Sequence, residues 1–174
     1  MNYDNNKPKI KRRVIFAFAI IVTAIIQNTG ARVDGVFDVH AFLLLPLIVS
    51  ISMFEREIVS SLLGALAGLL WDLSSGLDGY NMLVLMLICA VCSILINRVM
   101  RNNIVTAVVL GVTSIAVYIF LYIMIYIVLD GGGYPLSQVI RFYLPSFIFT
   151  SVLIPVYFFI VRTVFDSNRT IEEN

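Results

Sequence analysis

Few side chains in this 174-residue sequence are of types that carry out chemistry, and Asp72 is the first candidate. It follows small residues that helical spacing places on or beside one face, namely Ser61, Gly64, Ala65 and Gly68. The opposite face carries leucines, namely Leu62, Leu63, Leu66 and Leu70. Small residues allow two helix backbones to approach closely, and a Gly-x-x-x-Gly spacing is typical of helix contacts inside membranes. A carboxylate at the C-terminal end of a helix lies at the negative end of the helix dipole, so Asp72 needs a cation or hydrogen-bond donors.

The pair Cys89-x-x-Cys92 and the single histidine, His40, are the candidates for a metal or redox site. The cysteines fall in the middle of an apolar stretch, without a second cysteine pair nearby. Their spacing on a continuous helix also fits disulfide geometry poorly. We therefore expect the cysteines to be small packing residues, and we predict neither a metal nor a cofactor.

Sequence signatures of enzymes are missing. The sequence has no Gly-x-Ser-x-Gly, no His-Glu-x-x-His and no Gly-x-x-x-x-Gly-Lys-Ser/Thr. We therefore predict that the protein is not an enzyme. A tyrosine recurs at every fourth position, at Tyr118, Tyr122 and Tyr126, and indicates either a packed interior face or a face that lines a cavity.

The composition places these residues in a membrane protein. Hydrophobic residues make up 60% of the chain and charged residues 13%, and the mean hydropathy is +0.95. A soluble domain of this length has too much surface for its volume to bury so many apolar side chains. We predict an all-α integral membrane protein, and the absence of an extended basic patch beyond the N-terminal arm argues against binding of nucleic acid.

Six apolar stretches predict six transmembrane helices in a compact bundle. They cover residues 14–28, 39–54, 58–73, 81–96, 104–129 and 141–164. The six-helix domain of residues 14–164 thus lies between a basic arm, residues 1–13, and a polar tail, residues 165–174. The first stretch is short enough to resemble a signal peptide, but the spans that follow favour a retained helix. Pro46 predicts a kink in the second stretch.

The basic residues predict the orientation in the membrane. With the N-terminus inside, the inner segments hold ten of the 12 lysines and arginines, and the outer segments hold only Arg32 and Arg141. Both termini are therefore predicted on the cytoplasmic side. Residues 55–57 form a charged inner turn, and the basic inner surface suits an anionic lipid or an acidic cytosolic partner.

Arg32 and Arg141 are the candidate ion-pair partners of Asp72, because all three residues are predicted on the outer side. We expect such a pair to hold two helix ends together near the membrane surface. The alternative is that Asp72 lies in interfacial water and only ends its helix, because a carboxylate costs far less there than at the midplane. The small residues beneath the carboxylate favour the packed role.

One segment of the sequence resembles a known family. Gly64-x3-Gly68-x3-Asp72, followed by a turn and Gly79-Tyr80-Asn81, is similar to the bacterial rod shape-determining protein MreD family. Length, hydropathy and the basic N-terminus extend the resemblance over the chain, although the second span is very short and residues 131–133 form an unusual glycine triplet. The resemblance implies a fold similar to the six-helix substrate-binding subunits of energy-coupling-factor vitamin transporters.

The resemblance also implies a function. Members of the family are non-enzymatic subunits of the cell-elongation machinery, which maintains rod shape and peptidoglycan synthesis at the bacterial cytoplasmic membrane. The implied partners are an MreC-type bitopic membrane protein, an MreB-type actin-like filament and the peptidoglycan polymerase–transpeptidase pair, with membrane lipid around them. Gly64, Gly68, Asp72 and Gly79 match the family pattern, and their implied role is helix packing and partner docking.

The alternative function is that of a substrate-binding subunit of an energy-coupling-factor vitamin transporter. Such subunits dock on their transmembrane partner through an Ala-x-x-x-Ala face on the first helix. The first span here has Ala17, Ala19 and Ala24, which lack that spacing. A stoichiometric bound vitamin in the purified protein would favour the transporter.

Overall fold

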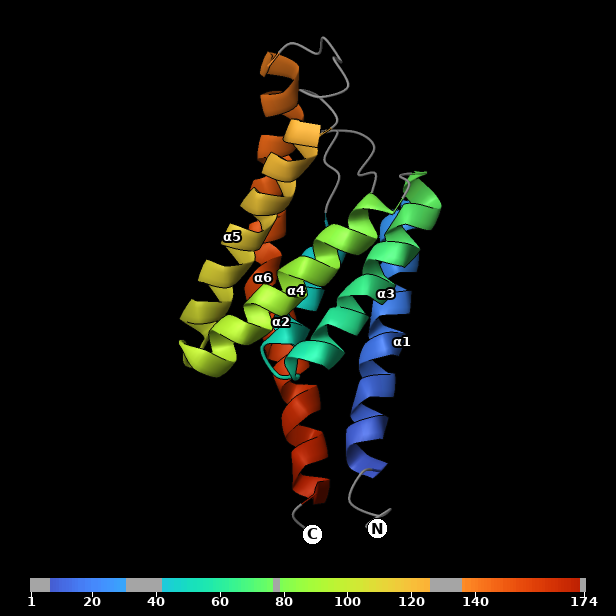
Figure 1. Ribbon diagram of the computed structural model, residues 1–174, viewed down its shortest axis with the longest axis vertical. Coiled ribbons are helices and arrows are strands. Elements are labelled where there is room, and N and C mark those ends of the chain that lie inside the picture. The colour runs from blue at the N-terminus through green and yellow to red at the C-terminus, as the bar shows by residue number, and fades with distance from the viewer. Residues whose placement is uncertain (1–6, 31–41, 77–78, 126–135, 173–174) are drawn as a thin grey trace.

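The structure is a computed structural model that describes residues 7–30, 42–76, 79–125 and 136–172. In these ranges the chain is all-helical, as predicted. The helices are α1 (Lys7–Gly30), α2 (Leu44–Ser52), α3 (Glu57–Ser75), α4 (Tyr80–Arg98), α5 (Ile104–Tyr122) and α6 (Leu136–Glu172) (Figure 1).

Four of these helices, α3 to α6, are long and apolar enough to cross a membrane. The apolar segments that qualify are Glu57–Ser75, Tyr80–Arg98, Ile104–Ile125 and Tyr143–Ser167. The prediction of six spans is therefore met in part. Two boundaries also differ from the prediction, because α1 begins at Lys7, within the expected arm, and α6 continues to Glu172, within the expected tail.

The second predicted span is the short helix α2, which has 9 residues. At 1.5 Å per residue it is only about 13 Å long, less than half of the roughly 30 Å hydrocarbon core. Every residue of α2 is buried, and the other five helices all contact it, α6 most extensively. α2 is therefore surrounded by protein. Pro46 lies in its first turn, where a missing N–H does not interrupt the helix, so the predicted mid-span kink does not arise.

Contacts at both ends of α2 show how much of the length of α1 the α2 segment covers. The backbone N–H of Leu44 donates to the side-chain oxygen of Gln27, near the end of α1, at 2.9 Å. Glu55, which follows α2, pairs with Arg12, near the start of α1. The segment from Leu44 to Glu55 therefore runs beside most of α1.

The start of α1 and the end of α6 lie at the same end of the molecule (Figure 1). The Arg12 guanidinium is 4.7 Å from the centre of the Phe165 ring, which places the two helices in contact there. The α2–α3 and α4–α5 connections face toward this same end (Figure 1). We refer to it below as the basic end, because it carries most of the arginines of the described residues.

Candidate functional site

The glycines predicted to pack helices contact α4 of the same chain. A Cβ atom added at Gly64 would lie 2.7 Å from the Cys89 sulfur and 2.8 Å from the Leu85 carbonyl oxygen. One added at Gly68 would overlap backbone atoms of Asn81 and Met82. These positions are too close for any side chain, so the two glycines allow α3 and α4 to form the most extensive helix pair of the fold.

The buried face of α3 is wider than the predicted stripe. It consists of Ser60, Leu63, Gly64, Ala67, Gly68, Trp71 and Asp72. Leu63, predicted on the opposite face, is in the core, because α3 contacts α1 and α2 as well as α4. Ser61 and Ala65 are half-buried at the edge of this face, and the Ser61 hydroxyl donates to the Glu57 carbonyl oxygen of its own helix.

Asp72 caps the N-terminus of α4. One carboxylate oxygen accepts the backbone N–H of Asn81 at 3.1 Å and the other accepts that of Met82 at 2.8 Å. The first N–H groups of a helix have no partner within the helix, and the helix dipole is positive there, so the carboxylate meets donors and a favourable field together. Arg32 and the side chain of Arg141 lie outside the described residues, so their pairing with Asp72 stays a prediction.

Gly79 explains why the N-terminus of α4 is capped by Asp72 of α3 and not by a residue of its own. It occupies the N-cap position of α4 with φ +80°, a left-handed conformation that favours glycine, and no side chain caps the helix from this position. Gly76 ends α3 with φ +67°, and its N–H donates to the Asp72 carbonyl oxygen at 3.0 Å. The end of α3 at Gly76 and the start of α4 at Gly79 thus lie close enough for the Asp72 side chain to reach the first amides of α4.

A buried polar and aromatic cluster continues from Asp72 into α5. The side-chain oxygen of Asn81 accepts the Tyr118 hydroxyl at 2.7 Å, and the Tyr80 hydroxyl donates to the Tyr118 carbonyl oxygen at 3.2 Å. The Tyr118 ring stacks on Trp71, with ring centres 5.2 Å apart. Tyr118 is therefore part of a packed interior face; Tyr126 lies outside the described residues.

The two cysteines are buried packing residues. Cys89 contacts Gly64, and the Cys92 sulfur lies 3.4 Å from the Ser114 hydroxyl oxygen. Both are free thiols. Among the described residues no three His, Cys, Asp or Glu side chains come together in a way that could hold a metal, and His40 lies outside the described part.

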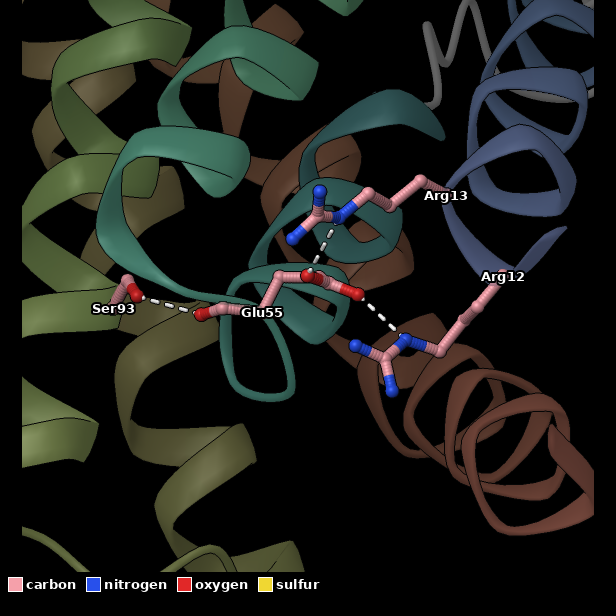
Figure 2. Close-up of polar contacts among 4 residues, drawn as sticks. All are labelled: Arg12, Arg13, Glu55 and Ser93. Carbon is pink, nitrogen blue, oxygen red and sulfur yellow. Dashed lines mark hydrogen bonds and ion pairs between the residues drawn. The ribbon is translucent and has the colours of Figure 1, made fainter. Parts of the chain in front are cut away.

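A second polar cluster lies at the basic end, and the sequence did not predict it. Glu55, 4% exposed, pairs with Arg12 at 2.6 Å and with Arg13 at 3.6 Å, as Figure 2 shows. The carbonyl oxygen of Glu55 accepts the Ser93 hydroxyl at 2.9 Å. The cluster therefore joins α1, the α2–α3 connection and α4.

Sequence reasoning assigned Arg12 and Arg13 to a basic cytoplasmic arm and Glu55 to a charged inner turn, and it did not pair them. The available signal was that Glu55 directly follows a largely apolar stretch, residues 41–54, because a carboxylate buried there needs a cation. Its partner lies 43 positions away in the sequence, which local patterns do not reveal.

Both polar clusters use their groups to hold helices together. The Asp72 cluster joins α3, α4 and α5, while the Glu55 cluster joins α1, α4 and the end of α2. Fold and site thus define a helical protein with apolar helices of membrane-spanning length. No protein-family model, curated protein or solved structure matches the chain.

Proposed function

We propose that this protein is a non-enzymatic MreD-type subunit of the bacterial cell-elongation machinery, and that it acts in the cytoplasmic membrane by helix contacts. The observation that carries this proposal is the family-like stretch itself. Its members Gly64, Gly68, Asp72, Gly79 and Asn81 all take part in one unit, the α3–α4 hairpin. If this chain shares the fold of the MreD family, the residues that match the family pattern should pack together in one structural unit, as these residues do.

The proposed topology has six crossings with both termini in the cytoplasm. The start of α1 and the end of α6 lie at the same end, which agrees with an even number of crossings (Figure 1). The segment that contains α2 runs beside most of α1, so it completes a return path through the bundle although α2 is short. The positive-inside rule places the basic end in the cytoplasm.

The proposed partners are an MreC-type bitopic protein, an MreB-type filament and the peptidoglycan polymerase–transpeptidase pair. α4 already occupies the space at Gly64 and Gly68, so these glycines shape the hairpin. Ser61 and Ala65 are the part of the small-residue stripe that is still accessible. We assign the contact with the single helix of the MreC-type partner to this edge, because small residues allow close approach.

The test is complementation of a rod-shaped bacterium depleted of its own MreD, combined with co-purification of the MreC-type partner. We expect the wild-type chain to restore rod shape and to retain the partner. Ala65→Leu should reduce partner recovery at an unchanged level of protein in the membrane. Ala116→Leu is the matched control, because Ala116 is an exposed alanine on α5, away from this edge.

Failure of the wild-type chain both to restore rod shape and to retain the partner would overturn the proposal. A stoichiometric vitamin in the purified protein would instead assign it to the energy-coupling-factor transporters. Equal partner recovery with Ala65→Leu and Ala116→Leu would remove the assignment of the docking edge.

A further inference from the structure

A groove separates α4 and α5 along most of their length. The two helices meet at their short connection, residues 99–103, and diverge from it (Figure 1). The groove has a volume of about 190 Å³ and opens to the outside of the bundle. Its buried floor includes Ile88, Cys92 and Leu110, and its sides include Val91, Leu95 and Val117. We call this feature the α4–α5 groove.

The chemistry of the groove fits an apolar occupant. Most lining side chains are aliphatic. The polar groups on its floor, Cys92 and Ser114, lie 3.4 Å apart and satisfy each other. Thr113 is the remaining polar residue of the lining. The groove therefore presents little that could recognise a polar molecule, and at membrane depth an apolar chain fills it with little loss of polar hydration.

The length of the groove fits one acyl chain of a membrane lipid. Its lining on α4 extends from Val84 to Leu95, about 16 Å at 1.5 Å per residue. This matches the roughly 15 Å depth of one leaflet of the hydrocarbon core.

Arginines lie at the closed end of the groove. Arg98 continues the lining face of α4, because it follows Val91 and Leu95 at spacings of seven and three residues. Arg101 lies in the connection to α5, and both arginines are exposed. In the part of the chain that the structure describes, neither forms an ion pair, and residues 97–103 contain no acid.

The connection that carries these arginines is held in place. The side-chain N–H of Asn102 donates to the Met53 carbonyl oxygen at the end of α2, at 3.0 Å. Arg98 and Arg101 therefore stay beside the groove's closed end. Arginine recognises phosphate by charge and by paired N–H donors.

We propose that the α4–α5 groove binds one acyl chain of an anionic phospholipid, with the phosphate of that lipid at Arg98 and Arg101. The apolar groove supplies the site for the chain, and the two arginines select the charged headgroup. This inference rests on membrane insertion of α4 and α5 and does not depend on a role in cell elongation.

The first test measures headgroup selection. Native mass spectrometry of the purified full chain, titrated with dioleoylphosphatidylglycerol or dioleoylphosphatidylcholine, gives the affinity for the first bound lipid. We expect tighter binding of phosphatidylglycerol. Each removed arginine should weaken that binding about 5-fold, so that Arg98→Gln with Arg101→Gln loses roughly 25-fold and with it the preference for phosphatidylglycerol. Arg56→Gln is the control, an equal charge change at an exposed site in the α2–α3 connection.

The second test locates the acyl chain. Val117→Phe places a larger side chain in the groove, whereas Val109→Phe makes the same change on α5 outside the groove. The exposures of the two valines are similar, 42% and 49%. We expect Val117→Phe to weaken the affinity for the first bound lipid with either headgroup, and we expect Val109→Phe to leave this affinity unchanged. Thermal unfolding of both variants identifies any loss that arises from misfolding.

Three results would overturn the proposal. One is an equal effect of Arg98→Gln and Arg56→Gln on phosphatidylglycerol binding. Another is unchanged binding of the first lipid to a folded Val117→Phe variant. The third is a dimer of the wild-type chain that Val117→Phe dissociates, because the groove would then belong to a second copy.

Discussion

Replacement of Gly68 by alanine should separate the two helices of the α3–α4 hairpin. The added Cβ would overlap backbone atoms of Asn81 and Met82, which cannot rotate away as a side chain can. Ordinary carbon–carbon contact requires about 3.5–4.0 Å, so the helices must move apart by about 1 Å at this point. The same two residues donate their N–H groups to Asp72, at 3.1 and 2.8 Å. A displacement of this size breaks or weakens both hydrogen bonds.

The expected loss of stability follows from the two hydrogen bonds to Asp72. A hydrogen bond to a charged group contributes about 1.5–3 kcal/mol, and overpacking adds about 1 kcal/mol or more. Asp72 is 9% exposed, so water replaces part of what is lost. We therefore expect Gly68→Ala to lower the free energy of unfolding by about 2–4 kcal/mol.

Two other glycines complete a graded series. At Gly64 an added Cβ meets one carbonyl oxygen and the Cys89 sulfur, so we expect an intermediate loss. At Gly111 the nearest atoms are all in the Ile154 side chain, with Cδ1 at 2.6 Å and Cγ1 at 2.9 Å, so a side chain rather than a backbone has to shift. Gly111→Ala should therefore cost only about 1 kcal/mol, the lower end of the range for overpacking.

Equilibrium unfolding in mixed micelles measures this series, with fluorescence of the single tryptophan, Trp71, as the signal. Trp71 stacks on Tyr118 near the hairpin turn, so its emission reports the packing in question. An unfolding midpoint of Gly68→Ala equal to that of the wild-type chain would refute the close-packing argument. A larger loss for Gly111→Ala than for Gly68→Ala would refute the ranking.

Three further predictions use the same assay. Asp72→Asn should lower the free energy of unfolding by about 1–2 kcal/mol and Asp72→Leu by more, because only asparagine retains an acceptor for the α4 amides. Equal stability of both variants and the wild-type chain would show that Asp72 does not cap α4. Glu55→Gln should lower the free energy of unfolding by about 3 kcal/mol, because it leaves the buried charge of Arg12 uncompensated. Adding Arg12→Gln to the same chain should restore part of this stability. If the losses of the two single variants simply add in the double variant, the two residues do not form a stabilising pair. Tyr118→Phe should cost about 1–2 kcal/mol by leaving the buried oxygen of Asn81 without its donor, and an unchanged midpoint would show that this hydrogen bond contributes nothing.

Hydropathy located the long helices well. The predicted spans 58–73 and 81–96 correspond to Glu57–Ser75 and Tyr80–Arg98, because a lipid-facing helix must be apolar over its whole length. The same signal did not show that the helix at the second stretch has only 9 residues. Its residues Leu44–Ser52 are apolar because protein surrounds them, and a short buried helix and a membrane span look alike in composition.

The sequence also identified residues of the site more readily than their partners. Small residues before Asp72 indicated close helix packing, and Gly64 and Gly68 contact α4 closely. Asp72 was expected to need a cation or hydrogen-bond donors, and in the structure its carboxylate accepts two backbone N–H groups, which no residue type in the sequence identifies. The Glu55 cluster was missed because Arg12 reaches it only through the packing of α1 against the end of α2.

The enclosed position of α2 has a consequence for how the protein is made. A 9-residue helix is too short to be recognised as a span during insertion, and the helix it contacts most, α6, is synthesised after the other five described helices. A nascent chain that lacks α6 thus exposes one side of α2 and cannot complete its interior. We expect the final arrangement of the bundle to form only after translation of the C-terminal helix, when the earlier helices are already in the membrane.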